Sequence, residues 1–271
     1  MIVKKLKNIW KQYIVRDRII PVQVPVYDFG NIFSGKTAVV TGGSSGIGLG
    51  VSKALAKSGC KVYITGRDGQ KIESISKDIG CDFLVLDVCN TKMISDVISN
   101  FPHNIDMLIN SAGYHGKDEF GRVSESCWDT VIDTNVKGLY FISQAVANHM
   151  KERGVRGNIL NISSASALKP GWTPYEISKH AVNSITVGMA DKLINYGIVV
   201  NGIAPGPVAT PMMGRNDEHE LDLTWKANPS GRMLTVGEVV NLALFMLSDM
   251  GRAMVGTTAY ITGGSGTISW K

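Results

Sequence analysis

A tyrosine and a lysine stand four residues apart in the segment YEISK, at Tyr175 and Lys179. On a helix this spacing places both side chains on one face, where they can touch. An ammonium group beside a phenol favours the phenolate and lowers the tyrosine pKa from about 10 toward neutral pH. The pair therefore predicts proton transfer, with Tyr175 as general acid or base. The same spacing is common on helix surfaces, so the pair alone leaves a purely structural role open.

The residues around the pair predict where its helix begins. Thr173 and Glu176 have the spacing of a capping box, and Pro174 suits the first helical position. Tyr175 is therefore expected in the first turn, where the positive end of the helix dipole adds to the stabilisation of a phenolate.

A second candidate site is the glycine-rich segment TGGSSGIG, residues 41–48, which follows an apolar run and leads into a helical pattern. Gly42, Gly46 and Gly48 permit a tight turn with close backbone approach, and the helix after them offers free N–H groups to a phosphate. This order of strand, glycine turn and helix favours dinucleotide binding over a structural turn.

The end of the next apolar run indicates which dinucleotide binds. In such folds an acidic residue there holds the 2′-hydroxyl of the adenosine ribose, but this chain has Gly66 followed by Arg67. A guanidinium suits a 2′-phosphate, so Arg67 favours NADP(H) over NAD(H). An isolated arginine on a solvated loop is the alternative.

These residues lie on a regular alternation of short apolar runs and helical patterns. Such alternation predicts an α/β, doubly wound Rossmann fold with a seven-stranded parallel sheet. Helices are expected at residues 49–57 and 236–247. The expected strands are residues 37–40, 61–65, 82–88, 105–110, 157–163, 198–204 and 257–263.

Composition and charge narrow the class of protein further. The 271 residues, with 44% apolar and 19% charged composition, suit one α/β domain, expected at residues 35–271. Residues 1–20 hold six of the 28 basic and one of the 23 acidic residues, so the rest carries no net formal charge and no nucleic-acid binding is expected. The four cysteines lack a C-x-x-C spacing and predict buried free thiols, without disulfides or a metal site.

Together these motifs resemble those of the short-chain dehydrogenase/reductase family in its ordinary single-domain form. TGGSSGIG is similar to its cofactor loop, NSAG (residues 110–113) to its NNAG motif, and YEISK to its catalytic YxxxK pair. NISS, DTNVKG and IAPGPVAT match further blocks, and the resemblance spans about residues 35–264. It implies an oxidoreductase that moves a hydride between a carbonyl and an alcohol, commonly as a homotetramer.

The resemblance also implies roles for individual residues. Tyr175 would exchange a proton with the substrate oxygen, Ser164 would hydrogen-bond it, Lys179 would hold the nicotinamide ribose, and Asn135 would help to position a relay water. Ser163 and Ser164 should point to opposite sides of a strand end; the family pattern favours Ser164, although the interval of 11 residues to Tyr175 is two shorter than usual there. The implied cofactor contacts are Gly42, Ser44, Ser45, Gly46, Ile47, Gly48, Arg67, Asp87, Val88, Asn110, Ala112, Gly113, Tyr175, Lys179, Pro205, Gly206, Val208 and Thr210.

The substrate pocket is expected among the loop after NSAG, the loop before Tyr175 and the segment after Thr210. His115, Trp172 and Met212 are its candidate residues. Aromatic and methionine side chains suggest an apolar or ring-shaped substrate, but a lid that packs on its own domain has the same composition.

Residues 1–34 form a separate extension. Leu6, Ile9, Trp10, Tyr13 and Ile14 recur at helical spacing among lysines, and residues 21–34 have the composition of a linker. A basic amphipathic helix suits an anionic membrane surface, or equally its own domain or a partner subunit. With no apolar run of membrane-spanning length and no secretory signal, the expected location is the cytoplasm, with membrane association through this helix as one option.

Three functions remain open at this point. The first is an NADP(H)-dependent carbonyl reductase, for which the glycine turn, Arg67 and the four candidate catalytic residues argue. The second is an NAD-dependent alcohol dehydrogenase of the same family. The third is a catalytically idle binding protein on this scaffold, against which the intact Tyr175 and Lys179 pair argues.

Overall fold

Seven parallel strands form a single sheet in the computed structural model, which describes residues 28–116, 119–215 and 222–268. The strand order is β3-β2-β1-β4-β5-β6-β7, so the direction of winding reverses beside β1. The expected seven-stranded Rossmann sheet is therefore confirmed. The strands are β1 (Thr37–Thr41), β2 (Lys61–Gly66), β3 (Asp82–Val85), β4 (Met107–Asn110), β5 (Asn158–Ile162), β6 (Val199–Pro205) and β7 (Thr258–Ile261).

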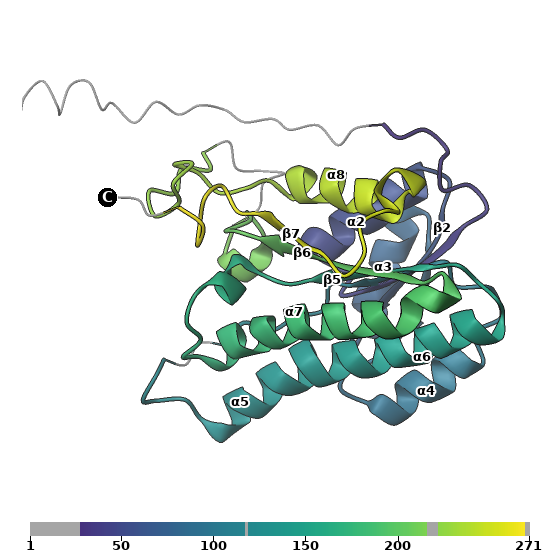
Figure 1. Ribbon diagram of the computed structural model, residues 1–271, viewed down its shortest axis with the longest axis horizontal. Helices are drawn as coiled ribbons and strands as arrows, with labels where there is room; N and C mark the ends of the chain where they lie inside the picture. Colours follow the sequence, from purple (N-terminus) through teal and green to yellow (C-terminus); the bar gives the residue numbers. More distant parts are fainter. Residues whose placement is uncertain (1–27, 117–118, 216–221, 269–271) are drawn as a thin grey trace, which may run out of the picture.

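Helices cover both faces of the sheet, with α2, α3 and α8 on one face and α4, α5, α6 and α7 on the other (Figure 1). The π-helical segment η1 (Asp133–Gly138) joins α5 directly to α6. The longer helices are α2 (Gly46–Lys57), α3 (Gly69–Ile79), α4 (Thr91–Ser99), α5 (Glu125–Ile132), α6 (Leu139–Glu152), α7 (Pro174–Leu193) and α8 (Val236–Leu247). Short 3-10 turns are η2 (Ala165–Leu168), η3 (Ile194–Tyr196), η4 (Pro211–Met213) and η5 (Asp249–Gly251).

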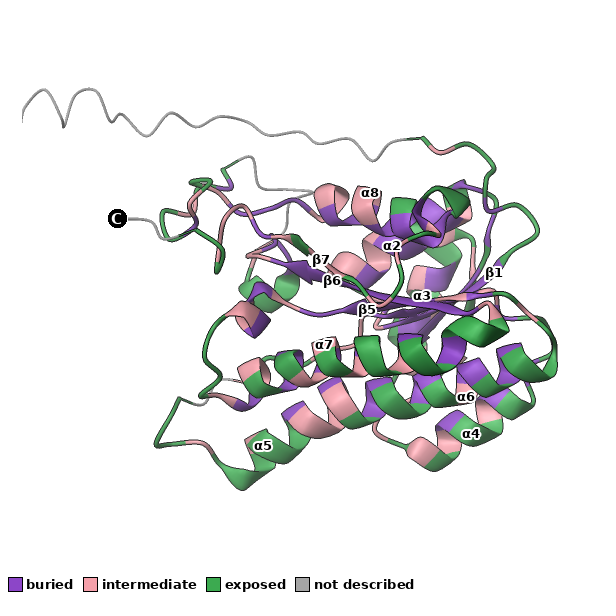
Figure 2. Cartoon of the chain, in the orientation of Figure 1, coloured by how far each residue is buried: buried purple, intermediate pink, exposed green. Residues whose placement is uncertain are grey.

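The apolar core consists of two layers separated by the sheet. Figure 2 shows the central strands buried, and each helix turns one buried stripe toward them. On one face Leu55 and Leu244 pack over β1, and on the other Ile142 and Val146 pack under β4 and β5. Burial on both faces explains why the central strands read as continuous apolar runs.

The edges of the sheet depart from the sequence prediction. The run expected as a strand over residues 82–88 leaves the sheet after Val85, and Phe83 and Val85 are exposed by 36% and 44%. An edge strand has a neighbour on one side only, so it is shorter and less covered than a central strand. Helix α2 begins at Gly46, three residues before the expected start, whereas α8 has the expected bounds.

The amino-terminal boundary and the cysteines also differ in part from expectation. Phe33 is 3% exposed and packs in the core, so the packed domain includes residues of the expected linker. All four cysteines lie in the described ranges and are free, but only Cys60 is buried. The expected helix at residues 1–20 lies outside the described residues. In the part of the chain that is described, we find no helix with the length and apolarity to cross a bilayer.

Candidate active site

A cavity of about 330 Å³ opens at the carboxyl ends of the central strands. The loops after β1, β4, β5 and β6 and the first turns of α7 line it, as expected for a parallel sheet at the point where the strand order reverses. Of the residues proposed from sequence, the cavity brings together Gly42, Ser45, Gly46, Ile47, Ala112, Gly113, His115, Ser164, Tyr175, Lys179, Pro205, Gly206, Val208, Thr210 and Met212. Those outside its lining are Ser44, Gly48, Arg67, Asp87, Val88, Asn110, Asn135 and Trp172.

Tyr175 lies in the first turn of α7, as the sequence predicts. The Thr173 hydroxyl accepts from the Glu176 N–H, and the Glu176 carboxylate accepts from the Thr173 N–H, so the capping box is present. Burial raises the pKa of Tyr175 above its ordinary value, and a side-chain hydrogen bond with Ser164 offsets part of this rise. The lowered pKa expected from sequence is therefore wrong, because removal of the phenol from water outweighs the stabilisation of its phenolate.

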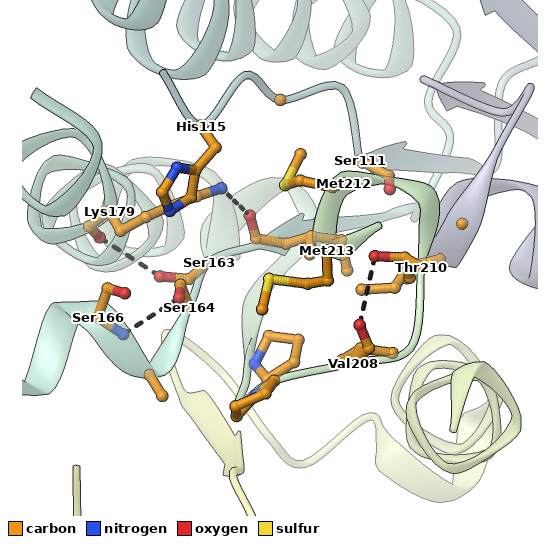
Figure 3. A pocket seen from close by; sticks show the side chains of 18 of the residues that line it. Ser111, His115, Ser163, Ser164, Ser166, Lys179, Val208, Thr210, Met212 and Met213 are labelled. Atoms are coloured by element: carbon orange, nitrogen blue, oxygen red, sulfur yellow. Dashed lines mark hydrogen bonds between the residues drawn. The ribbon is translucent and has the colours of Figure 1, made fainter. Parts of the chain in front are cut away.

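Lys179 follows one turn later and points into the same cavity (Figure 3). Its Nζ donates to the main-chain oxygen of Ile162 over 2.9 Å and lies 5.5 Å from the centre of the Tyr175 ring. Burial lowers the pKa of Lys179 to about 8. The expected contact between the two side chains is thus with the face of the ring, and the ammonium is held by the end of β5.

The two neighbouring serines after β5 have different partners. The Ser163 hydroxyl donates to Asn183 Oδ1 over 2.6 Å and is committed to α7. The Ser164 Oγ accepts from the Ser166 N–H over 3.1 Å and hydrogen-bonds with Tyr175. Both serines line the cavity (Figure 3), but Ser164 is the one that hydrogen-bonds with the Tyr175 phenol.

Asn135 lies in the π-helical segment, 1% exposed. Its Oδ1 accepts from the Tyr114 N–H over 2.8 Å, and its Nδ2 donates to the Tyr114 carbonyl over 2.9 Å and to Ser178 Oγ over 3.0 Å. The side chain therefore holds the loop after β4 against α7. A π-turn widens the helix by one residue, which is common at functional sites.

Replacement of Asn135 with Ala is expected to lower the free energy of unfolding by about 2 kcal/mol, because it removes the hydrogen bonds of a buried amide to the main chain of Tyr114 and to Ser178. We expect turnover to fall as well, since His115 is on the same loop. Urea unfolding measures the first effect, with Asn148→Ala on the exposed side of α6 as control. Equal stability of the two variants would contradict the anchoring role.

The glycine turn between β1 and α2 leaves a helix end free. Ser45 stands at the N-cap of α2 without a side-chain cap, whereas side chains cap α3, α4, α5, α7 and α8. Gly42 has φ of +63°, and a Cβ there would lie 2.8 Å from the backbone of Ala112. The first N–H groups of α2 thus face open space beside the cavity, which suits the pyrophosphate of a dinucleotide.

Known proteins share this arrangement over most of the chain. A family model described as enoyl-(acyl carrier protein) reductase matches residues 42–266. Gluconate 5-dehydrogenase of Gluconobacter oxydans (strain 621H) is 37% identical over 243 residues, which are 85% of this chain and 94% of that protein. A 3-oxoacyl-(acyl-carrier-protein) reductase of Chlamydia trachomatis serovar D is 33% identical over 241 residues, or 84% and 96% of the two chains.

A solved structure described as a short chain dehydrogenase/reductase family protein agrees at a TM-score of 0.79 and 34% identity, covering 87% of this chain and 99% of that one. The chain belongs to the short-chain dehydrogenase/reductase family. Members of this family are oxidoreductases that use NAD(P)(H).

At the end of this dehydrogenase sheet where adenosine is expected, Arg67 is exposed directly after β2. The neighbouring carboxylate of Asp68 accepts from the Lys71 N–H and caps α3. Asp87 accepts from the Cys89 N–H over 2.9 Å, and Val88 is buried. Among the described residues, no carboxylate forms an ion pair with Arg67.

Asn110 differs most from the role that family resemblance implied. Its Nδ2 donates to Ser143 Oγ on α6 and to Asn161 Oδ1 on β5, each over 2.8 Å. Its Oδ1 is buried without a partner among the described residues. The amide thus joins β4, β5 and α6 and is not available to a ribose in this arrangement. Family resemblance alone does not separate this internal role from a contact with the cofactor.

The cavity of this short-chain dehydrogenase/reductase also shows contacts and lining residues that the sequence did not indicate. The ring of His115 stacks on that of Tyr175 with centroids 4.3 Å apart and planes at 35°. Lys169, Ser166 and Ser265 also line the cavity. Lys169 lies in the short interval between Ser164 and Tyr175, so that unusual spacing was the available signal. Trp172 is 56% exposed and lies outside the lining. Its backbone N–H donates to the Glu176 carboxylate.

Proposed function

We propose that this chain is an NADP(H)-dependent oxidoreductase that interconverts a carbonyl and an alcohol, with Tyr175 as general acid or base. The observation that carries the proposal is the position of Tyr175 in the cavity at the carboxyl ends of the strands. Its hydroxyl hydrogen-bonds with Ser164, its ring stacks on that of His115, and Lys179 Nζ lies 5.5 Å from the ring centre. Nicotinamide, when bound, supplies or accepts the hydride.

The residues of the chain then have separate tasks. Tyr175 exchanges a proton with the substrate oxygen, and Ser164 holds that oxygen by a hydrogen bond. Lys179, a cation at the base of the cavity, holds the nicotinamide ribose. Asn135 fixes the loop after β4 and, as family resemblance implies, helps to position a relay water. The raised pKa of Tyr175 keeps the hydroxyl protonated at neutral pH, which supports carbonyl reduction in that range.

The cofactor would contact the protein at the cavity and at Arg67. The uncapped start of α2 receives the pyrophosphate, and Thr210, Pro205 and Gly206 lie on the nicotinamide side of the cavity. Arg67 receives the 2′-phosphate, supported by its exposure after β2 and by the commitment of Asp68 to the start of α3. The alternative is an NAD-dependent alcohol dehydrogenase, which would be favoured if Arg67 does not contribute to NADPH binding.

Replacement of Arg67 with Ala is expected to weaken NADPH binding by about 10- to 100-fold, because a charge-assisted contact to the 2′-phosphate is lost. NADH lacks that phosphate, so its dissociation constant should change less than about threefold. Fluorescence titration of both cofactors measures the effect. Lys77→Ala, at the other end of α3, removes the same charge as a control. Unchanged NADPH affinity in the Arg67 variant would refute the assignment of NADP(H).

The activity itself is tested by the oxidation of NADPH in the presence of carbonyl compounds. The relatives suggest two chemical starting points, since one is named for gluconate and the other for a 3-oxoacyl carrier protein. Absence of turnover with every carbonyl compound, despite cofactor binding, would favour a binding protein on this scaffold. The remaining proposals are a location in the cytoplasm and a homo-oligomer.

A further inference from the structure

Among the residues that the structure describes, the charged side chains that line the cavity are all basic. The titratable side chains there are Lys169, Lys179, His115 and Tyr175, and the lining contains no Asp or Glu. Lys179 is buried at the base and bound to the Ile162 oxygen, so it is committed to the catalytic pair. This leaves Lys169 as the lysine on the substrate side.

Lys169 is held in place by its backbone while its side chain remains free. It ends the 3-10 turn η2, and its main-chain oxygen accepts from His180 Nε2 over 2.7 Å. Within residues 28–116, 119–215 and 222–268, its ammonium forms no ion pair. The carboxylate of Glu176 accepts from the N–H groups of Trp172 and Thr173 and belongs to the capping box of α7.

His115 adds a second polar group on the side of Tyr175 that faces solvent. Its Nδ1 lies 2.8 Å from the Gly116 oxygen, and because that oxygen can only accept, Nδ1 carries a proton. Nε2 therefore remains for a ligand, and it donates to an anion when the ring is protonated. The ring itself stacks on that of Tyr175, with centroids 4.3 Å apart.

We propose that Lys169, together with His115, binds a carboxylate of the substrate, so that the substrates are oxo acids and the matching hydroxy acids. This inference rests on the proposed carbonyl–alcohol activity. Lys169 and His115 are both exposed on the wall of a cavity whose lining contains no carboxylate, so an anionic ligand can reach them and form charge-assisted hydrogen bonds.

An anion could also come from the phosphates of a thioester carrier, but the position of Lys169 argues against that source. Lys169 and Tyr175 line one cavity of about 330 Å³, so one small molecule can carry both the carbonyl and the anion. The phosphates of coenzyme A are separated from the thioester by the long pantetheine arm. A carboxylate on the same small molecule as the carbonyl therefore suits this cavity better.

The test compares oxo acids of three to six carbons, each paired with its methyl ester, in assays of NADPH oxidation. Replacement of Lys169 with Gln is expected to raise KM for the preferred acid by about tenfold or more and to change kcat by less than about threefold. KM for the ester should stay unchanged, and Lys169→Arg should restore binding of the acid. Lys192→Gln, at the distant end of α7, removes the same charge as a control.

Binding is measured separately, by isothermal titration calorimetry of the same acid into protein saturated with NADP⁺, which requires no turnover. The variant His115→Phe keeps a ring on Tyr175 and removes Nε2, so it should weaken binding of the acid by more than it weakens binding of the ester. Equal use of acid and ester by the wild type, or equal loss of both in Lys169→Gln, would overturn the inference.

Three further outcomes show how the inference and the function on which it depends stand or fall. Reduction of esters and acids alike supports the proposed activity and rejects the anion site. Reduction of acetoacetyl-CoA with a KM that rises in Lys169→Gln would assign the site to a phosphate and overturn the carboxylate. Failure of all carbonyl compounds, together with absence of acid binding, would reject the proposed function and the inference together.

Discussion

Replacement of Tyr175 with Phe is expected to lower kcat by about 10²- to 10⁴-fold, since it removes the proton donor from the cavity. The benzene ring keeps the contact with His115 and the volume that Tyr175 fills in the first turn of α7. The fold and the affinity for NADPH should therefore remain as in the wild type. Steady-state kinetics with a reducible carbonyl compound, combined with a cofactor titration, distinguishes loss of chemistry from loss of binding.

The pH dependence of the wild type gives a second view of the same hydroxyl. Burial raises the pKa of Tyr175, so the protonated form that reduction needs persists through neutral pH. Carbonyl reduction is expected to fall, and alcohol oxidation to rise, as the pH increases through the pKa of this group. Turnover in Tyr175→Phe within about threefold of the wild type would refute the assignment of the general acid.

Replacement of Lys179 with Met is expected to reduce kcat by about 10²-fold or more and, in contrast, to increase stability. Burial lowers the pKa of Lys179 to about 8, so the folded protein bears the cost of a buried charge at neutral pH. Methionine removes that cost but leaves the Ile162 oxygen without its donor. The net gain in free energy of unfolding is about 1–2 kcal/mol at pH 7.

This gain should shrink at alkaline pH, and the direction follows from proton binding. Below about pH 8 Lys179 is charged in both the folded and the unfolded chain, so the folded state bears the full penalty. Above it the folded protein releases the proton while the unfolded chain, with a pKa near 10.5, retains it, and wild-type stability rises relative to the variant. Urea unfolding at pH 7 and pH 9.5 measures the difference. A variant less stable than the wild type at pH 7 would contradict a buried ammonium.

Local signals in the sequence were sufficient for most of the architecture. The apolar runs mark seven strands, and Thr173 and Glu176 mark the start of α7 to the residue, because capping depends on side chains within one turn. The carboxyl-terminal end of β3 could not be predicted in this way. Whether an apolar run remains in the sheet depends on a neighbouring strand, and β3 has one only on the side of β2.

The candidate site was predictable where it follows from motifs and unpredictable where it depends on long-range packing. The glycine turn, Ser164, Tyr175 and Lys179 meet at the sheet edge as the motifs indicated. The internal bonds of Asn110 join residues 33 and 51 positions away, and no local pattern shows them. The direction of the Tyr175 pKa also depends on how completely surrounding elements exclude water, which sequence spacing does not reveal.

The π-helical segment between α5 and α6 makes this region sensitive to chain length as well as to residue type. A π-turn accommodates one residue more than an α-turn, so loss of a single residue between Asp133 and Gly138 would let α5 and α6 fuse into one regular helix. Backbone hydrogen bonding would survive such a deletion. The part of the helix before it would rotate by about 100° relative to the part after it. Asn135 would then leave the Tyr114 loop, so even exposed positions of this segment, such as Lys137, should tolerate substitution but not deletion during evolution.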